Sequence, residues 1–131
     1  MKRVLHLEPR AGQISASTID GIEDIQELLK LYDPDTKKWE EEPCYFTCVT
    51  AYIDGEEYTV FVDDEGLLKT KAENRDNFFV INGYPYPLCG NAVIMGGTTE
   101  DGDTLPCEAS TSFMLKNVQL FRGDVVCHHI D

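Results

Sequence analysis

The dipeptide Asp54-Gly55 constrains the fold of this chain most, because it stands between two segments rich in β-forming residues. Residues 44–53 and 56–62 carry Tyr, Phe, Val and Thr, the residue types that favour strands. An Asp-Gly pair between two such segments is typical of a two-residue type I′ turn. The sequence therefore predicts a β-hairpin over about 44–62, and a hairpin requires antiparallel pairing.

Two other segments have helical spacing. Over about 20–32, apolar residues recur three or four positions apart and form one stripe, with Asp20 as the predicted N-cap and Glu23 as its capping-box partner. Over about 110–122 a second apolar face ends at Gly123, a residue type that often terminates helices. The apolar residues of the two predicted helices are Ile22, Ile25, Leu28, Leu29, Tyr32, Met114, Leu115, Val118 and Phe121.

The remaining pattern consists of short strands and loops. Strands are expected over 2–8, 14–17, 78–82, 92–95 and 125–130, and a surface loop over 33–43. Strands and helices do not alternate regularly, which argues against a parallel βαβ arrangement. We predict an α+β fold, mainly an antiparallel sheet with two packed helices, in a single domain over residues 1–131.

The composition points to a cytoplasmic protein. No apolar segment approaches the roughly 18 residues that a membrane helix needs, and the first residues lack the apolar core of a secretory signal. The chain holds five cysteines, and an odd number without a signal peptide favours reduced thiols in a reducing compartment. We therefore expect no membrane contact.

Negative charge is concentrated in one part of the sequence. The net charge is −13, and residues 20–66 alone hold fifteen acidic and three basic side chains. Like charges repel a phosphate backbone, so direct nucleic-acid binding is not expected, whereas a basic protein partner fits. The alternative is that the acidity only keeps the chain soluble. The residues predicted to bind the partner are Glu23, Asp24, Glu27, Glu40, Glu41, Glu42, Glu56 and Glu57.

Cysteine and histidine pairs give no metal or catalytic assignment. Cys44 and Cys48 lie in a predicted strand, where residues four apart are about 13 Å distant, too far to share one zinc ion. A site formed by Cys107, Cys127 and His129 stays open, and it would suit a hydrolase or metal enzyme. No catalytic residue, metal or cofactor is assigned.

Three motifs give the chain a family resemblance. Residues 62–69 read Val-Asp-Asp-Glu-Gly-Leu-Leu-Lys, Asn74-Arg75 follows, and residues 90–96 read Gly-Asn-Ala-Val-Ile-Met-Gly. Together they resemble the domain-of-unknown-function family 3846, which occurs in bacteria, phages and mobile elements. Asp63, where the family usually has Asn, and residues 84–88 depart from its pattern. The resemblance implies an accessory protein of a mobile element and no established reaction.

Three functions remain open at this point. The first is a protein that binds a basic partner, with mimicry of DNA to inhibit a host enzyme as its most specific form. The second is a small-ligand or nucleotide-binding domain, whose pocket would be lined by Asn74, Arg75, Tyr84 and Tyr86, since arginine grips carboxylate or phosphate with two hydrogen bonds. The third is the enzyme that would use Cys107, Cys127 and His129. The first two are favoured, and enzymatic activity is the least expected.

Overall fold

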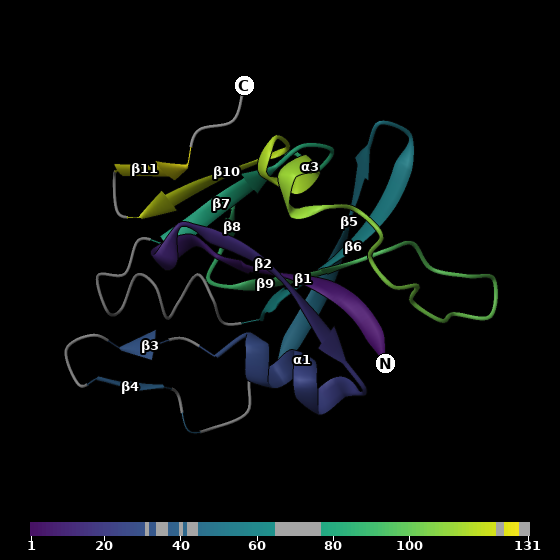
Figure 1. Cartoon of the computed structure of the whole chain (residues 1–131), viewed down its shortest axis with the longest axis horizontal. Coiled ribbons are helices and arrows are strands. Elements are labelled where there is room, and N and C mark those ends of the chain that lie inside the picture. The colour runs from purple at the N-terminus through teal and green to yellow at the C-terminus, as the bar shows by residue number, and fades with distance from the viewer. Residues whose placement is uncertain are drawn as a thin grey trace.

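Strands dominate the computed structural model, which describes residues 1–30, 32–33, 37–39, 41, 45–64, 77–122 and 125–128 (Figure 1). Three antiparallel sheets are present in these residues. Two α-helices accompany them in these residues, α1 (Ile22–Leu28) and α3 (Thr111–Leu115), together with the short 3-10 helix η1 (Pro9–Ala11). The strands are β1 (Lys2–Glu8), β2 (Gln13–Ile19), β3 (Tyr32–Asp33), β4 (Lys38–Trp39), β5 (Phe46–Ile53), β6 (Glu56–Asp63), β7 (Asn77–Ile81), β8 (Leu88–Cys89), β9 (Ala92–Met95), β10 (Val118–Arg122) and β11 (Val125–His128).

The largest sheet contains the hairpin predicted from Asp54-Gly55. Its strand order is β2-β1-β9-β6-β5, so β2 and β5 form its edges. Strands β5 and β6 pair without interruption from Ile53↔Glu56 at the turn to Phe46↔Asp63 at the far end. Asp54 and Gly55 have φ values of 52° and 81°, as a type I′ turn requires. The predicted α+β class and its hairpin are confirmed.

The five-stranded sheet is covered on both faces. Alternation along β1 sends Leu5 and Leu7 to one face and Val4 to the other. The first face packs against α3 and the four-stranded sheet β11-β10-β7-β8, with Phe79 among the fully buried residues. The second face packs against α1 through Ile25. Helix α1 therefore lies at one end of the molecule, and the turn of the β5–β6 hairpin lies at the other (Figure 1).

Both predicted helices are present, and both are shorter than the sequence suggested. The second one covers only Thr111–Leu115, and Val118–Arg122 is strand β10, paired with β7. Val118 and Leu120 are both buried, a two-residue period that the helical spacing of Val118 and Phe121 concealed. Residues 118–122 form a strand because they pair with β7, which is distant in the sequence.

The start and end of the first helix also differ from the prediction. Gly21 is its N-cap, and Asp24 rather than Glu23 closes the first turn by accepting a hydrogen bond from the Asp20 amide at 2.7 Å. The helix ends at Leu28, so Tyr32 lies in strand β3 instead. Ile22, which belongs to the predicted apolar stripe, is 62% exposed.

Part of the predicted surface loop over 33–43 is a small sheet. Tyr32↔Trp39 and Asp33↔Lys38 pair as the antiparallel strands β3 and β4. Trp39 is 52% exposed, which agrees with the predicted surface position of this segment. No helix in the described part of the chain has the length and apolar character needed to cross a membrane.

Candidate functional site

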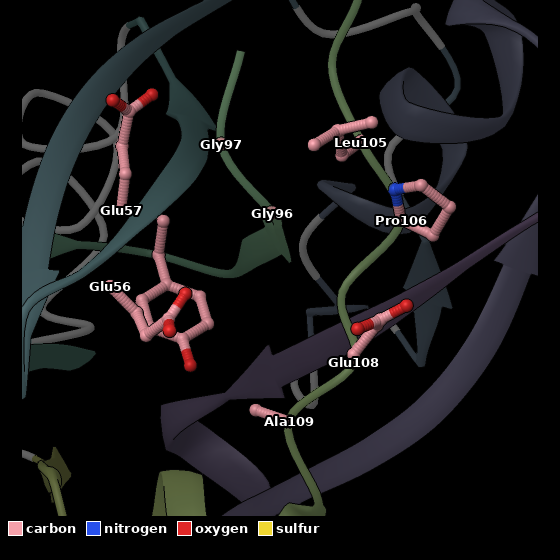
Figure 2. Close-up of a pocket in the computed structure, with 9 residues that line it drawn as sticks. Glu56, Glu57, Gly96, Gly97, Leu105, Pro106, Glu108 and Ala109 are labelled. Atoms are coloured by element: carbon pink, nitrogen blue, oxygen red, sulfur yellow. The ribbon is translucent and has the colours of Figure 1, made fainter. Parts of the chain in front are cut away.

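A hollow of about 200 Å³ lies beside the turn of the β5–β6 hairpin. One side is the start of β6, and the other is the segment 105–109, which precedes α3. Gly96 and Gly97 lie between the two sides (Figure 2). We call this feature the acidic hollow, and its lining residues are Glu56, Glu57, Tyr58, Gly96, Gly97, Leu105, Pro106, Glu108 and Ala109.

The floor of the acidic hollow depends on a close backbone approach. The Gly96 amide donates to the Leu105 carbonyl at 2.9 Å, and the Leu105 amide donates to the Gly97 carbonyl at 2.8 Å. A Cβ atom at Gly96 would lie 2.6 Å from the Pro106 carbonyl oxygen, closer than such atoms approach in proteins. Glycine at position 96 therefore lets segment 105–109 lie directly against the end of β9.

The far wall of the hollow is held by β1. The Cys107 amide donates to the Arg3 carbonyl at 2.8 Å. In return, Arg3 Nη1 donates to the carbonyl oxygens of Cys107 at 2.8 Å and Ala109 at 2.7 Å. Segment 105–109 thus lies between the start of β1 and the glycines that follow β9, Gly96 and Gly97. Hydrogen bonds on both sides therefore hold the backbone that carries Glu108.

Three carboxylates give the hollow its charge. Glu56 and Glu57 stand on the β6 side and Glu108 stands opposite (Figure 2). Glu57 is oriented because its Oε2 accepts a hydrogen bond from the Thr98 amide at 3.0 Å. No lysine or arginine lines the hollow among the described residues, so this concave surface attracts cations and repels phosphates.

Tyr58 also lines the acidic hollow. The residue is only 8% exposed, and its ring packs against Phe113 at a centroid distance of 6.4 Å. Burial, with further contributions from Cys107, Glu56 and Asp54, raises the pKa of the phenol above its ordinary value of 10.0. The hydroxyl therefore keeps its proton to a higher pH than the hydroxyl of an exposed tyrosine does.

The predicted acidic partner surface is divided in two by the fold. Glu23, Asp24 and Glu27 lie on α1, at the opposite end from Glu56 and Glu57 (Figure 1). On α1, Glu27 forms an ion pair with Lys30 at 2.9 Å. Glu41 is exposed, and the predicted residues Glu40 and Glu42 lie outside the described residues.

Of the four residues predicted to line a nucleotide pocket, the structure describes Tyr84 and Tyr86, and it brings these two into contact. Asn74 and Arg75 lie outside the described residues. Tyr84 is half-buried against the core, and its ring contacts the exposed Tyr86 edge-on at 5.9 Å. Neither tyrosine lines the acidic hollow.

The cysteine positions give no support to a shared site. Cys107 is fully buried, and this burial raises the pKa of its thiol. Cys127 belongs to β11, whereas His129 and Cys44 lie outside the described residues. Within the described residues, no group of three His, Cys, Asp or Glu side chains is placed to hold a metal ion.

A second hollow, of about 420 Å³, lies at the N-terminal end of α1. Apolar side chains form most of its wall and polar residues form its rim. Sequence reasoning missed both hollows. The sequence held no signal for this one, because the exposure of Ile22 appears only in the fold, whereas Gly96-Gly97 was the signal for the acidic hollow. The wall of the second hollow consists of Ile19, Ile22, Ile25, Phe46, Phe61 and Met95, and its rim of Lys2, Asp20, Gly21, Gly102, Asp103 and Thr104.

Comparison with known proteins identifies the family of this chain. The model of the family described as "Domain of unknown function (DUF3846)" matches residues 1–114. The match covers most of the chain, including both hollows, so the chain belongs to this family. Comparisons with curated proteins and with solved structures gave no match.

Proposed function

We propose that this member of the DUF3846 family binds a basic segment of a partner protein and receives a lysine or arginine side chain in the acidic hollow. The observation that carries this proposal is that Glu56, Glu57 and Glu108 all line one concavity. Charge-assisted hydrogen bonds between a cationic side chain and carboxylates are stronger than neutral ones. Glu57 is partly buried, which weakens solvent screening of an ion pair there, whereas Glu56 and Glu108 are exposed.

The size of the acidic hollow favours a side chain over a nucleotide. Pockets for drug-sized ligands usually measure about 300–1,000 Å³, and this one measures about 200 Å³. Its carboxylates would also repel phosphate groups. A lysine or arginine fits both constraints, because its apolar stem can lie against Leu105 and Pro106 while its head reaches the carboxylates.

The second acidic surface, on α1, would act differently. Glu23, Asp24 and Glu27 lie on a convex helix, and Glu27 already has a partner in Lys30. Exposed charges of this kind mainly steer association and add little to the affinity of the final complex. We assign to α1 an increase in the association rate and to the acidic hollow the specific contact. The partner would be cytoplasmic, and the protein would serve a phage or mobile element as an accessory factor.

The test compares two variants with the same change in charge. A labelled oligolysine peptide and a labelled oligoarginine peptide serve as probes, with oligoglutamate as the negative control, and binding is measured by fluorescence anisotropy. Glu56→Gln/Glu57→Gln/Glu108→Gln should weaken binding about tenfold or more, since one lost charged contact is worth about 1.5–3 kcal/mol. Glu23→Gln/Asp24→Asn/Glu27→Gln should weaken it only a few-fold and mainly through the association rate.

Two results would contradict the proposal. Equal losses in the two triple variants would show that binding depends only on net charge. Failure to recover any salt-sensitive partner from a lysate of the producing organism, at low and raised salt, would also count against a protein partner. Glu57→Gln keeps an oxygen that can accept the Thr98 hydrogen bond, so the variant changes the charge and preserves the geometry.

The second hollow supports a second candidate, binding of a small apolar ligand. Its volume of about 420 Å³ falls within the small-ligand range, and Ile25, Phe46 and Phe61 supply an apolar wall. A thermal-shift screen with apolar small molecules and with nucleotides would test it. A rise in the melting temperature that is lost in Phe61→Ser would support ligand binding in this hollow, and no rise with any compound would reject it.

A further inference from the structure

Strand β5 is an edge of the five-stranded sheet, and the turn beside it fixes which of its backbone groups face outward. In a two-residue type I′ hairpin the residues flanking the turn, here Ile53 and Glu56, form a hydrogen-bonded pair. Every second residue of β5 therefore faces β6, and the others face away. The Asp64 amide donates to the Tyr45 carbonyl at 2.9 Å, as this alternation requires at the far end.

Four residues of β5 thus direct their N–H and C=O groups away from β6, in the plane of the sheet, namely Phe46, Cys48, Thr50 and Tyr52. Tyr52 already uses its amide, which donates to the Gly83 carbonyl at 3.4 Å. Phe46, Cys48 and Thr50 make no such outward backbone hydrogen bond to another described residue. A row of unpaired backbone groups at a sheet edge is a template for another strand.

Within the part of the chain that the structure describes, strand β5 also lacks the features that usually protect an edge. Proteins block such pairing with charged side chains, proline, bulges or a covering element. The sequence of β5, FTCVTAYI, contains no charged residue and no proline, and its pairing with β6 has no bulge. The opposite edge, β2, is in contact with both α1 and α3. The lack of protection on β5 is therefore a local property of this edge.

We propose that β5 pairs with β5 of a second copy of this chain, antiparallel and about a two-fold axis that passes between the two Cys48 residues. This register uses the three outward residues that have no such bond to a described residue, and it keeps the hydrogen bond from the Tyr52 amide to the Gly83 carbonyl. Phe46 of each copy would lie opposite Thr50 of the other, and the two five-stranded sheets would become one continuous sheet.

The side chains of β5 suit a second copy. Pairing about Cys48 places uncharged residues opposite uncharged residues, so no like charges oppose each other across the new ladder. Tyr45 and Tyr52, at the two ends of the strand, are 77% and 61% exposed. Tyrosine is enriched in protein interfaces, where its ring is buried and its hydroxyl forms a hydrogen bond. Symmetric dimers are the commonest soluble oligomers.

The proposed dimer and the proposed basic partner respond to salt in opposite directions. Each copy has a net charge of −13, so two copies repel each other until salt screens them. Self-association should therefore strengthen as salt is raised, whereas binding of a basic partner should weaken. The dimer does not depend on the function of the acidic hollow, and either proposal can fail alone.

The register predicts a specific cross-link. Residues in a hydrogen-bonded antiparallel pair have Cα atoms about 5.5 Å apart, and disulfides usually span about 4.4–6.8 Å between Cα atoms. Cys48 is exposed and unbridged, so mild oxidation or a short bis-maleimide should join two wild-type chains through it. Cys48→Ser should stay dimeric and lose the cross-link, which excludes the other cysteines as its source.

The decisive measurement is the mass in solution by analytical ultracentrifugation, at low and raised salt. The wild type should be a dimer that salt strengthens, and Cys48→Lys should be a monomer because it places two ammonium groups beside the axis. Thr18→Lys, the same charge change on the exposed part of the other edge strand, should stay a dimer. A wild type that stays monomeric at its highest soluble concentration and at every salt concentration would overturn the proposal, as would a dimer unaffected by Cys48→Lys.

Discussion

Arg3 and Cys107 bind each other in both directions. The amide of Cys107 donates to the carbonyl of Arg3 at 2.8 Å, and the guanidinium of Arg3 donates back to the carbonyl of Cys107 at 2.8 Å. The same guanidinium nitrogen reaches the carbonyl of Ala109 at 2.7 Å. A residue near the start of the chain therefore fixes the backbone that carries Glu108, and the shape of the acidic hollow depends on β1.

Arg3→Gln should lower the free energy of unfolding by about 1–3 kcal/mol, because a shorter uncharged side chain cannot serve both carbonyls. Urea denaturation followed by circular dichroism measures this loss. Lys116→Gln removes the same charge from an exposed position after α3 and should change stability by less than about 0.5 kcal/mol. If both variants lost the same stability, net charge would be the cause and the contact with segment 105–109 would be unimportant.

Stability should fall as pH rises above the ordinary cysteine pKa of 9.0. Burial raises the pKa of both Cys107 and Tyr58, so the folded chain keeps these two protons to higher pH than the unfolded chain does. Their contribution is complete below the unfolded pKa values and is lost as pH rises through the folded ones. Urea midpoints measured from neutral pH to above 10.0 should decline, and less steeply in Tyr58→Phe. Tyr86→Phe, on an exposed ring, controls for the substitution itself.

Thiol reactivity gives a separate check on the same burial. Cys48 is exposed and Cys107 is fully buried with a raised thiol pKa. Because the thiolate is the reactive form, iodoacetamide at mildly alkaline pH should modify Cys48 first and Cys107 only after denaturation. Peptide mass spectrometry after timed quenching follows each site. Rapid modification of Cys107 in the native protein would show that segment 105–109 opens easily.

Gly55→Ala and Gly83→Ala should differ although both glycines have positive φ values, 81° and 86°. A Cβ atom at Gly55 meets nothing within 4 Å, so that variant should lose only the conformational cost of about 1–2 kcal/mol. A Cβ atom at Gly83 would lie 2.1 Å from the Tyr52 carbonyl oxygen, and the backbone must move. Urea unfolding should show a loss at Gly83 several kcal/mol larger, or no folded protein. Similar losses would mean that the 82–84 turn yields without cost.

The parts of the fold that were predictable depend on local chemistry. Asp54-Gly55 alone sets the turn and the register of its hairpin. The boundaries of β1 and β9 follow from short apolar patterns in the sequence. Residues 118–122 were predicted wrongly because their strand exists only through pairing with β7. Propensity carries no information about so distant a partner.

Two of the three carboxylates of the candidate site were predictable from the sequence. Glu56 and Glu57 were identified from the density of acidic residues in the sequence, and Glu108 was not, because it lies outside that acidic segment. Its position opposite them depends on Arg3 and on the close approach at Gly96, both of which are long-range contacts. Grouping the acids by sequence also united α1 with the hairpin, which the fold separates.

Asn91 should prove to be a structural residue, although it lies in one of the motifs that carry the family resemblance. It is 5% exposed, and its side-chain amide donates to the Lys30 carbonyl at 3.0 Å, which ties the end of α1 to the start of β9. Asn91→Ala removes this donor in a buried position and should cost about 1–3 kcal/mol in urea unfolding. Asn82→Ala removes an exposed bond to Asn117 and should cost about 0.5 kcal/mol or less. Because Asn91 is remote from the carboxylates of the acidic hollow, Asn91→Ala should leave oligolysine affinity within about twofold of wild type under conditions where both are folded. A loss of affinity without a loss of stability would instead place Asn91 in a binding surface.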